Sequence, residues 1–318
     1  MRPLIDAPSL GPVRILLVTA RIDRHARELI QAFGDLGAEV HTAGLAEIGF
    51  DTGAASGLTI PHFGENLPDA VCVRTMDAGS FEQVTRRLGV LHALTRLGVL
   101  VSNDARAIEN CVDKSMTSFL IARAGLPSPR SFTVESRAEA LRITAAEAGP
   151  LVLKPLFGAQ GNGLKLIHTA DDLPAAEDIA GGVYYLQRFA GVETAGRWSD
   201  VRILVSAGRA AASMRRQAAS WITNVKQGAE PMPMPPDGDL EALAVAATEA
   251  VGGDFCGVDL LRDAAGRAQI IEVNSMPAWT GLKKATGCDL AAIRARDLLA
   301  QVEARRAASA FRSLSAAE

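Results

Sequence analysis

The sequence predicts an α/β domain with a parallel sheet at the N-terminal end, followed by a larger α+β region with antiparallel sheets. Apolar runs alternate with amphipathic helical segments over residues 14–103, and from about residue 113 short strands outnumber helices. Two further strands, at 256–262 and 268–274, are separated by a short turn. With 318 residues the chain is longer than one typical domain and can form two or three lobes.

The N-terminal domain is predicted from a βαβ rhythm. Short apolar runs suit buried strands, and the helical segments between them suit the crossovers that a parallel sheet needs. The loop at 49–68 contains Gly and Pro, and no GxGxxG follows the first strand, so we do not expect a dinucleotide site there. The expected strands are 14–20, 39–43, 70–75 and 99–103, with helices at 23–36 and 80–97.

The second region begins with a helix at 113–125 and continues with strands separated by turns. This order favours antiparallel sheets over a continued parallel one. A helix at 238–251 precedes the two strands of the final hairpin, and an alanine- and arginine-rich helix follows residue 288. The remaining expected strands are 151–155, 164–168, 183–189, 200–206 and 210–216.

Composition excludes several classes of protein. The 33 basic and 36 acidic residues give a net charge of −3, which offers no electrostatic case for nucleic acid. The four cysteines contain no CxxC pair, so neither a disulfide framework nor a zinc site is indicated. Apolar runs such as ILLV are too short to cross a bilayer, and the N-terminus lacks the features of a secretory signal. We therefore expect a cytoplasmic protein that does not enter a membrane.

The stretch FGAQGNGLKLI at 157–167 is the first candidate binding element. It lacks the GxxxxGK[ST] sequence of a Walker loop and runs into a strand instead of a helix. Glycines in a turn between strands leave backbone N–H groups open to phosphate oxygens, so the stretch is either a phosphate-covering hairpin or an ordinary turn.

Two lysines favour the phosphate interpretation. Lys154 ends an apolar run just before Pro155, where it is either a cation aimed at phosphate or a lysine whose ammonium reaches solvent. Lys114 follows Asp113 at the start of a helix, where a solvated first-turn residue is an equal alternative. Only the combination of the lysines with the glycines points to a nucleotide.

Oxygen-bearing side chains gather on the final hairpin. Glu272 and Asn274 are two residues apart in a strand and so leave the same face, and Asp259 lies in the neighbouring strand. Two carboxylates and an amide oxygen with no His or Cys beside them suit Mg²⁺. The alternative is a set of surface acids near the hairpin ends.

An ordered series of motifs resembles the ATP-grasp ligases, and within them the RimK-type α-L-glutamate ligases. The similarity covers residues 104–281, and its specificity lies in the order and spacing of the motifs. It implies an ATP-grasp fold behind an N-terminal parallel α/β (pre-ATP-grasp) domain, divided as 1–103, 104–190 and 191–318. The motifs are DK at 113, LVLKPLFGAQGNG at 151, YLQRF at 185, DVR at 200, MRR at 214, ITNVKQG at 222, GVDLL at 257 and EVN at 272.

The resemblance also implies roles for individual residues. Lys114 and Lys154 would contact the phosphates of ATP, and Gln187 and Phe189 would hold the adenine. Asp259, Glu272 and Asn274 would bind Mg²⁺, with Mn²⁺ as a substitute. The glycine-rich phosphate lid would comprise Gly158, Gln160, Gly161 and Gly163, and the acyl phosphate or acidic substrate would face Arg202, Arg215 and Asn224.

The implied activity is an ATP- and Mg²⁺-dependent carboxylate–amine ligation through an acyl phosphate. We expect L-glutamate to be added to a small-molecule carboxylate, such as a pterin- or furan-type cofactor precursor, by a homo-oligomeric enzyme. The positive group Arg202, Arg215, Arg216 and Lys226 favours an acidic co-substrate. The alternatives are glutamylation of a protein C-terminus and a nucleotide-binding regulatory protein without turnover. Trp221 and Trp279 are either aromatic walls for a planar acceptor or ordinary packing residues.

Overall fold

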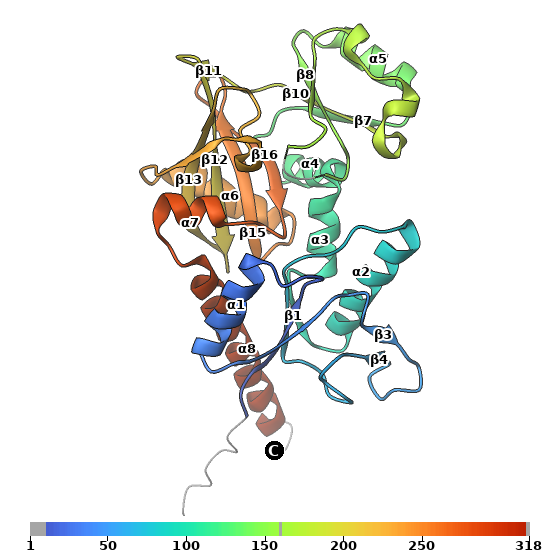
Figure 1. The fold of residues 1–318 in the computed structure, drawn as a ribbon, viewed down its shortest axis with the longest axis vertical. Coiled ribbons are helices and arrows are strands. Elements are labelled where there is room, and N and C mark those ends of the chain that lie inside the picture. Colours follow the sequence, from blue (N-terminus) through green and yellow to red (C-terminus); the bar gives the residue numbers. More distant parts are fainter. Residues whose placement is uncertain (1–10, 159–160, 316–318) are drawn as a thin grey trace, which may run out of the picture. The chain divides into compact units, whose positions relative to one another are not determined.

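A four-stranded parallel sheet forms the centre of the first unit of the chain in a computed structural model, which describes residues 11–158 and 161–315 (Figure 1). The first unit comprises residues 1–102 and 291–318, and the second comprises residues 103–290. The strand order in the parallel sheet is β2-β1-β5-β6, and every pairing is parallel. The predicted parallel sheet is therefore confirmed. Its strands are β1 Arg14–Val18, β2 Glu39–Ala43, β5 Ala70–Val73 and β6 Leu100–Ser102.

Two helices of the first unit begin at polar side chains that cap them. Asp23 accepts a hydrogen bond from the N–H of Ala26 at the start of α1, and Ser80 and Gln83 form a reciprocal capping box at the start of α2. A small two-stranded sheet lies in the loop before β5. These elements are α1 Arg24–Asp35, α2 Phe81–Arg96, β3 Gly49–Phe50 and β4 Leu58–Thr59.

The C-terminal helix α8, Leu290–Ser315, joins the first unit through polar contacts. The buried Arg294 donates from Nη2 to the carbonyl oxygen of Ser102 at 3.2 Å, and Arg306 forms an ion pair with Asp69 at 2.8 Å. The sequence placed 191–318 in a single C-terminal region, whereas the structure groups residues 291–318 with the N-terminal domain. The proposed division at residue 190 stays a prediction.

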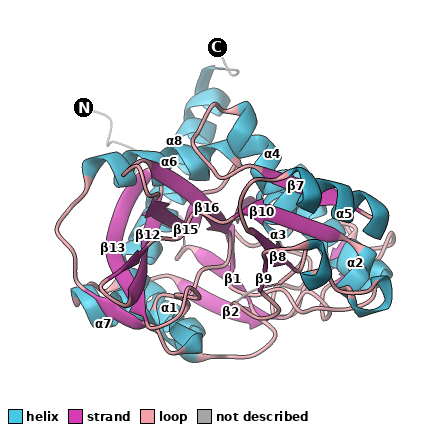
Figure 2. Ribbon diagram, turned by 90° about the horizontal axis from the view of Figure 1, so that it is seen from above, coloured by secondary structure: helices cyan, strands magenta, loops and turns pink. Residues whose placement is uncertain are grey.

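The second unit contains two antiparallel sheets, as the order of strands and turns predicts (Figure 2). A four-stranded sheet has the order β7-β10-β8-β9, and a six-stranded sheet has the order β14-β13-β12-β15-β16 with β11 paired to β12. The smaller sheet comprises β7 Ser131–Val134, β8 Leu151–Lys154, β9 Lys165–Ile167 and β10 Tyr184–Arg188. The larger sheet comprises β11 Glu193–Thr194, β12 Arg197–Ser206, β13 Arg209–Ala218, β14 Glu230–Met232, β15 Phe255–Arg262 and β16 Ala268–Asn274.

Helices connect and cover these sheets. Asp113 caps α4 by accepting from the N–H groups of Ser115 and Met116, so Lys114 opens the helix as the sequence predicts. The α-helices are α3 Ala105–Val112, α4 Lys114–Arg123, α5 Arg137–Ala146, α6 Gly238–Ala250 and α7 Thr280–Thr286. The 3-10 turns are η1 Ala170–Asp172, η2 Ala176–Asp178, η3 Ala180–Gly182 and η4 Val225–Gln227.

The two faces of the six-stranded sheet differ in character because strand residues alternate between them. Val201, Ile203 and Val205 of β12 are buried in one hydrophobic cluster with residues of α6, including Leu240 and Ala244. The intervening residues of β12 therefore point to the other face. That second face carries the charged side chains of the candidate site.

The buried side chain of Asn103 ties together three segments of the second unit. Its Nδ2 donates to the carbonyl oxygens of Phe255 at 2.8 Å and Ser275 at 2.6 Å. Its Oδ1 accepts from the N–H groups of Asp254 at 2.6 Å and Phe255 at 3.0 Å. The amide thus fixes the start of β15 against the loop after β16, the hairpin that carries the oxygen-bearing side chains.

None of the helices in the described residues combines the length and apolar character needed to span a membrane.

We expect Asn103→Ala to lower the free energy of unfolding of the second unit by about 3–5 kcal/mol, because it removes four hydrogen bonds from buried groups. Urea unfolding followed by tryptophan fluorescence measures this unit, since all three tryptophans lie in it. Asn110→Ala is the control: Asn110 donates one bond to the Val251 carbonyl at 3.1 Å, and its loss should cost about 1 kcal/mol. Equal effects of the two substitutions would contradict the role of Asn103.

Candidate functional site

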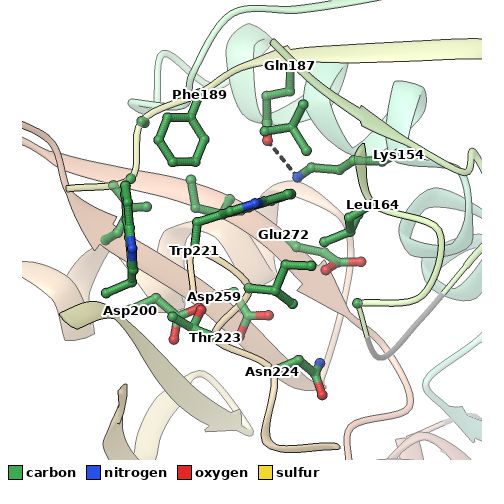
Figure 3. Close-up of a pocket in the computed structure, with 18 of the residues that line it drawn as sticks. Lys154, Leu164, Gln187, Phe189, Asp200, Trp221, Thr223, Asn224, Asp259 and Glu272 are labelled. Atoms are coloured by element: carbon green, nitrogen blue, oxygen red, sulfur yellow. Dashed lines mark hydrogen bonds between the residues drawn. The ribbon is translucent and has the colours of Figure 1, made fainter. Parts of the chain in front are cut away.

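One pocket in the second unit collects side chains from both antiparallel sheets (Figure 3). The smaller sheet contributes the ends of β8 and β10, and the larger sheet contributes its charged face. The loop after β13 and the start of α4 complete the wall. The polar and aromatic lining residues are Lys114, Lys154, Asn162, Gln187, Arg188, Phe189, Trp198, Ser199, Asp200, Arg216, Trp221, Thr223, Asn224, Asp259 and Glu272.

Lys154 is a buried cation at the end of β8. Its Nζ donates to Oε1 of Gln187 at 2.6 Å, so the alternative of a lysine reaching solvent is excluded. Burial lowers the pKa of Lys154 to about 8; the nearby Glu272 and Asp259 counteract part of this shift, and Lys114 adds to it. A positive charge held in this environment is available to an anionic ligand.

Gln187 carries a buried amide donor in the pocket wall. Its Nε2 is buried and has no hydrogen-bond partner within the described part of the chain. Buried amide donors are normally paired, so an unpaired one in a pocket wall suits an acceptor atom of a ligand.

An aromatic group lies beside Gln187. The ring of Phe189 is 5.5 Å from that of Trp198 and 5.8 Å from that of Trp221, both edge to face. Trp221 extends into the pocket, where it offers a flat apolar surface (Figure 3). Trp279 is different: it is 1% exposed and packs against Phe255, so ordinary packing is the right interpretation for that residue.

Lys114 connects the glycine-rich turn to the acidic hairpin. Its side chain is buried, which excludes the solvated alternative, and its Nζ donates to the carbonyl oxygen of Gly158 at 2.8 Å. The same Nζ lies 3.6 Å from Oε1 of Glu272. The two lysines and the carboxylates therefore face one pocket.

Asp259 and Glu272 are cross-strand partners on β15 and β16. Asn274 lies further along β16 opposite Gly257, whose carbonyl oxygen accepts from its Nδ2 at 3.3 Å. The described residues contain no cluster of three His, Cys, Asp or Glu side chains ready to hold a metal. Two carboxylates in a pocket with two lysines fit Mg²⁺, which keeps waters and ligand oxygens in its coordination shell. Asn274 does not line this pocket but follows Glu272 on the same strand.

A chain of alternating charges runs across the strands beneath the pocket. Arg202 forms a two-point contact with Asp259, with Nη2 to Oδ2 at 2.8 Å, and Arg216 forms a similar contact with Asp200, with Nε to Oδ1 at 2.7 Å. Nη2 of Arg216 also lies 3.1 Å from Oδ1 of Asp259. Burial opposes the charge on Asp259, but the guanidinium groups of Arg202 and Arg216 outweigh it and hold the pKa of this carboxyl below its ordinary value.

Gly257 gives Arg202 the room for this contact. A Cβ at position 257 would lie 2.9 Å from Nη1 of Arg202 and 3.0 Å from Cβ of Pro277. A side chain here would push the guanidinium away from Asp259.

The structure brings most of the predicted residues together. Arg202 lies behind the wall, where it contacts Asp259, and Gly163 forms the turn next to Pro155, where a Cβ would lie 2.8 Å from Cγ. Gln160 is outside the described residues. The predicted residues that line the pocket are Lys114, Lys154, Gly158, Gly161, Gln187, Phe189, Asn224, Asp259 and Glu272.

Arg215 is not brought to this pocket. It is exposed and pairs across the strands with Val201, whose side chain belongs to the cluster under α6. Its neighbour Arg216 points to the charged face instead. The sequence motifs assign no role to Asp200, which lines the pocket and binds Arg216. Its position two residues before Arg202 in a strand places both side chains on the same face, which is a signal that could have identified it.

Comparisons with known proteins agree with this geometry. A family model described as the RimK-like ATP-grasp domain matches residues 111–298. The tetrahydromethanopterin:alpha-L-glutamate ligase of Methanosarcina acetivorans is 31% identical, over 76% of this chain and 84% of that protein. The enzyme of the same name from Methanococcus maripaludis is 32% identical, over 71% and 78%.

Solved structures give the same fold. ATP-grasp ligase PsnB, complexed with a variant of its minimal precursor, Mg and ADP, has a TM-score of 0.69 at 22% identity, covering 92% of this chain and 99% of that one. D-cycloserine synthetase DcsG has a TM-score of 0.64 at 19% identity, covering 91% and 99%. These likenesses confirm the predicted ATP-grasp fold.

The buried charge of Lys154 should make stability depend on pH. The pKa is about 8 in the folded protein and near 10.5 in the unfolded chain, so between these values the unfolded state binds more protons and stability rises with pH. Lys154→Met should therefore be more stable than the wild type at pH 7, by up to about 3 kcal/mol, with the difference shrinking toward pH 10.5. Urea unfolding from pH 7 to 10.5 measures it. The exposed Lys165→Met is the control, and the same pH profile in both variants would refute the assignment.

Proposed function

The chain belongs to the RimK-like ATP-grasp family of ATP-dependent ligases, and we propose that it joins L-glutamate to the carboxylate of a small molecule with ATP and Mg²⁺. The observation that carries this proposal is the convergence of Lys114, Lys154, Asp259 and Glu272 on one pocket that also contains a buried amide donor without a partner among the described residues. An acyl phosphate made from the γ-phosphate of ATP is the proposed activated species. The amine then attacks its carbonyl carbon, and phosphate leaves.

The nucleotide end of the pocket is assigned to the part with Gln187 and the aromatic side chains. Nε2 of Gln187 can donate to a ring nitrogen of the base, and the faces of Phe189 and Trp221 can pack against it. Lys154 and Lys114 then lie on the side where the phosphates extend. Phosphoryl transfer needs mainly positioning and charge neutralisation, which these cations supply without a covalent intermediate on the protein.

Asp259, Glu272 and Asn274 are the proposed Mg²⁺ ligands. When bound, Mg²⁺ neutralises charge on the phosphate oxygens. The carboxylate of Asp259 is already fixed by its hydrogen bond with Arg202. The carboxylate of Glu272 has a looser contact, with its Oε1 3.6 Å from the Nζ of Lys114. Lys114 therefore orients a carboxylate that the metal also uses.

Arg216 and Asn224 are the proposed contacts of the acyl phosphate, and Arg202, which lies behind the pocket wall, is proposed to hold Asp259 in place. The guanidinium of Arg216 is already fixed by Asp200 and Asp259, so its directed N–H donors need little further ordering. This assignment replaces Arg215 with Arg216, because only Arg216 lines the pocket.

Glutamate as the amine is supported by the names of the relatives, which are alpha-L-glutamate ligases. The acceptor is proposed to be a small molecule, since the first of them acts on tetrahydromethanopterin by name. A polypeptide acceptor is the alternative, because LysX of Saccharolobus solfataricus is named for a ligation to LysW and PsnB is complexed with a precursor peptide.

We expect L-glutamate to support ADP formation with the correct acceptor, and L-glutamine to do so about tenfold to a hundredfold less well. Replacing the side-chain carboxylate with an amide removes a charge-assisted hydrogen bond worth roughly 1.5–3 kcal/mol. A screen of pooled amino acids and carboxylates, scored by ADP release and product mass, makes the comparison. A product containing a neutral or basic amino acid, with glutamate inert, would refute the glutamate assignment. No ADP release with any pool would favour the regulatory alternative.

Glu272→Gln should lower kcat by at least about a hundredfold at saturating Mg²⁺, because it keeps the shape of the side chain and removes a negative ligand. The fold should survive, since Glu272 lies at the pocket and not in the apolar core. Steady-state kinetics at several Mg²⁺ concentrations and circular dichroism measure the two effects. Glu193→Gln, which removes an equal charge from an exposed position on β11, should leave kcat unchanged. Near-normal turnover in Glu272→Gln would remove this residue from the metal site.

A further inference from the structure

Two segments that are far apart in the sequence meet at one wall of the pocket. Gly161 and Asn162 line the pocket from the glycine-rich turn, and Ile222 and Asn224 line it from the loop after β13. Gln227, in the short helix η4 of the same loop, lies next to this wall without lining it. Nε2 of Gln227 donates to Oδ1 of Asn162 at 3.0 Å. A cross-link therefore joins the turn between β8 and β9 to the loop that leaves the six-stranded sheet.

Close packing supports this hydrogen bond. Gly161 has a φ of +74°, and a Cβ at this position would lie 3.1 Å from Cγ2 of Ile222, 3.3 Å from Cβ of Asn224 and 3.4 Å from Cγ of Gln227. Only glycine adopts this backbone conformation without strain and also permits such an approach. Gly161 therefore packs directly against the segment 222–227.

The cross-linked segment holds Asn224 through a single helical turn. Oδ1 of Asn224 accepts from the N–H of Lys226 at 3.0 Å, and the carbonyl oxygen of Asn224 accepts from the N–H of Gln227 at 2.9 Å. Because Oδ1 is used within the turn, the amide group that remains for a ligand is the Nδ2 donor. A donor at this position suits an anionic phosphate or carboxylate oxygen.

We propose that Gln227 is a positioning residue for the ligation: by bonding to Asn162 it links the glycine-rich turn to η4 and holds Nδ2 of Asn224 toward the reacting group. The expected effect of Gln227 on turnover rests on the proposed function. The hydrogen bond between Gln227 and Asn162 does not, and a measurement without substrate can detect it. Gln227 touches no reacting atom and acts through Asn224.

The first test uses kinetics of the full chain with ATP, Mg²⁺ and both co-substrates. Gln227→Ala should lower kcat by roughly three- to tenfold, the equivalent of one hydrogen bond, and change the KM for ATP by less than about twofold. In an Asn224→Ala background the same substitution should have no further effect, because the group that it positions is gone. Full additivity of the two substitutions would overturn the proposal.

Conservative variants separate the hydrogen bond from general packing. Gln227→Glu keeps a bond to the Asn162 amide, which can turn to donate to the carboxylate, and should restore most of the kcat lost in Gln227→Ala, whereas Asn162→Leu removes the same bond and should match Gln227→Ala. Gln269→Ala is the matched control, since Gln269 makes a similar bond to Asp263 at 3.2 Å in the turn of the β15–β16 hairpin and does not line the pocket. Equal losses of kcat in Gln227→Glu and Gln227→Ala would contradict the bond.

Hydrogen exchange tests the link without any ligand. The amides of Gly228 and Ala229 donate to Val225 and Asn224 within this turn, so their exchange reports whether the turn is held. Gln227→Ala should speed their exchange by roughly three- to tenfold, and Gln269→Ala should not. Unchanged exchange would overturn the proposal even if the enzyme ligates glutamate. Faster exchange in a protein that shows no ligation would reject the proposed function and leave the link in place.

Discussion

The two-point contact of Asp259 with Arg202 is the interaction on which the rest of the site depends. A buried carboxylate is costly unless it is paired, and removing one partner from such a pair typically costs about 3–5 kcal/mol. Here the pair joins β12 to β15, and the second contact with Arg216 extends it to β13. Strand alternation places these charges opposite the apolar face that packs on α6. One face of the six-stranded sheet therefore packs in the hydrophobic core, and its other face carries the charged side chains of the pocket.

The pocket holds its charges at a cost to stability. Lys154 is kept in a site that lowers its pKa, and Nε2 of Gln187 has no acceptor in the described part of the chain. Neither arrangement favours folding, because buried charges and unpaired donors are both unfavourable. Under the proposed function, each becomes favourable when an anionic nucleotide supplies phosphate oxygens and an acceptor on its base. The same reasoning explains why Lys114 is placed between the Gly158 carbonyl and Glu272, groups that hold a cation before any ligand arrives.

The sequence singles out Lys154 as a charge at the end of an apolar run, and it singles out Glu272 and Asp259 as carboxylates on the two strands of one hairpin; both signals can be read without coordinates. The role of Arg215 came from its motif position, which does not say which of two adjacent strand residues faces the pocket; that face is set by the pairing of Arg215 with Val201, which the sequence does not reveal. The helix α8 belongs to the first unit through long-range contacts such as the hydrogen bond from Arg294 to Ser102, and the sequence alone does not reveal such contacts. The bond between Asn162 and Gln227 joins two polar loops and has no periodic pattern that would predict it.

The fate of one carboxylate oxygen tests the central claim most directly. If the acceptor carboxylate attacks the γ-phosphate of ATP and the amine later displaces phosphate, one oxygen of that carboxylate must leave in the phosphate. With the acceptor carboxylate labelled by ¹⁸O, mass spectrometry should find one labelled oxygen in the inorganic phosphate for each product molecule formed, and ADP should carry none. Label appearing in AMP, or phosphate without label while product accumulates, would contradict the acyl phosphate and the roles assigned to this pocket.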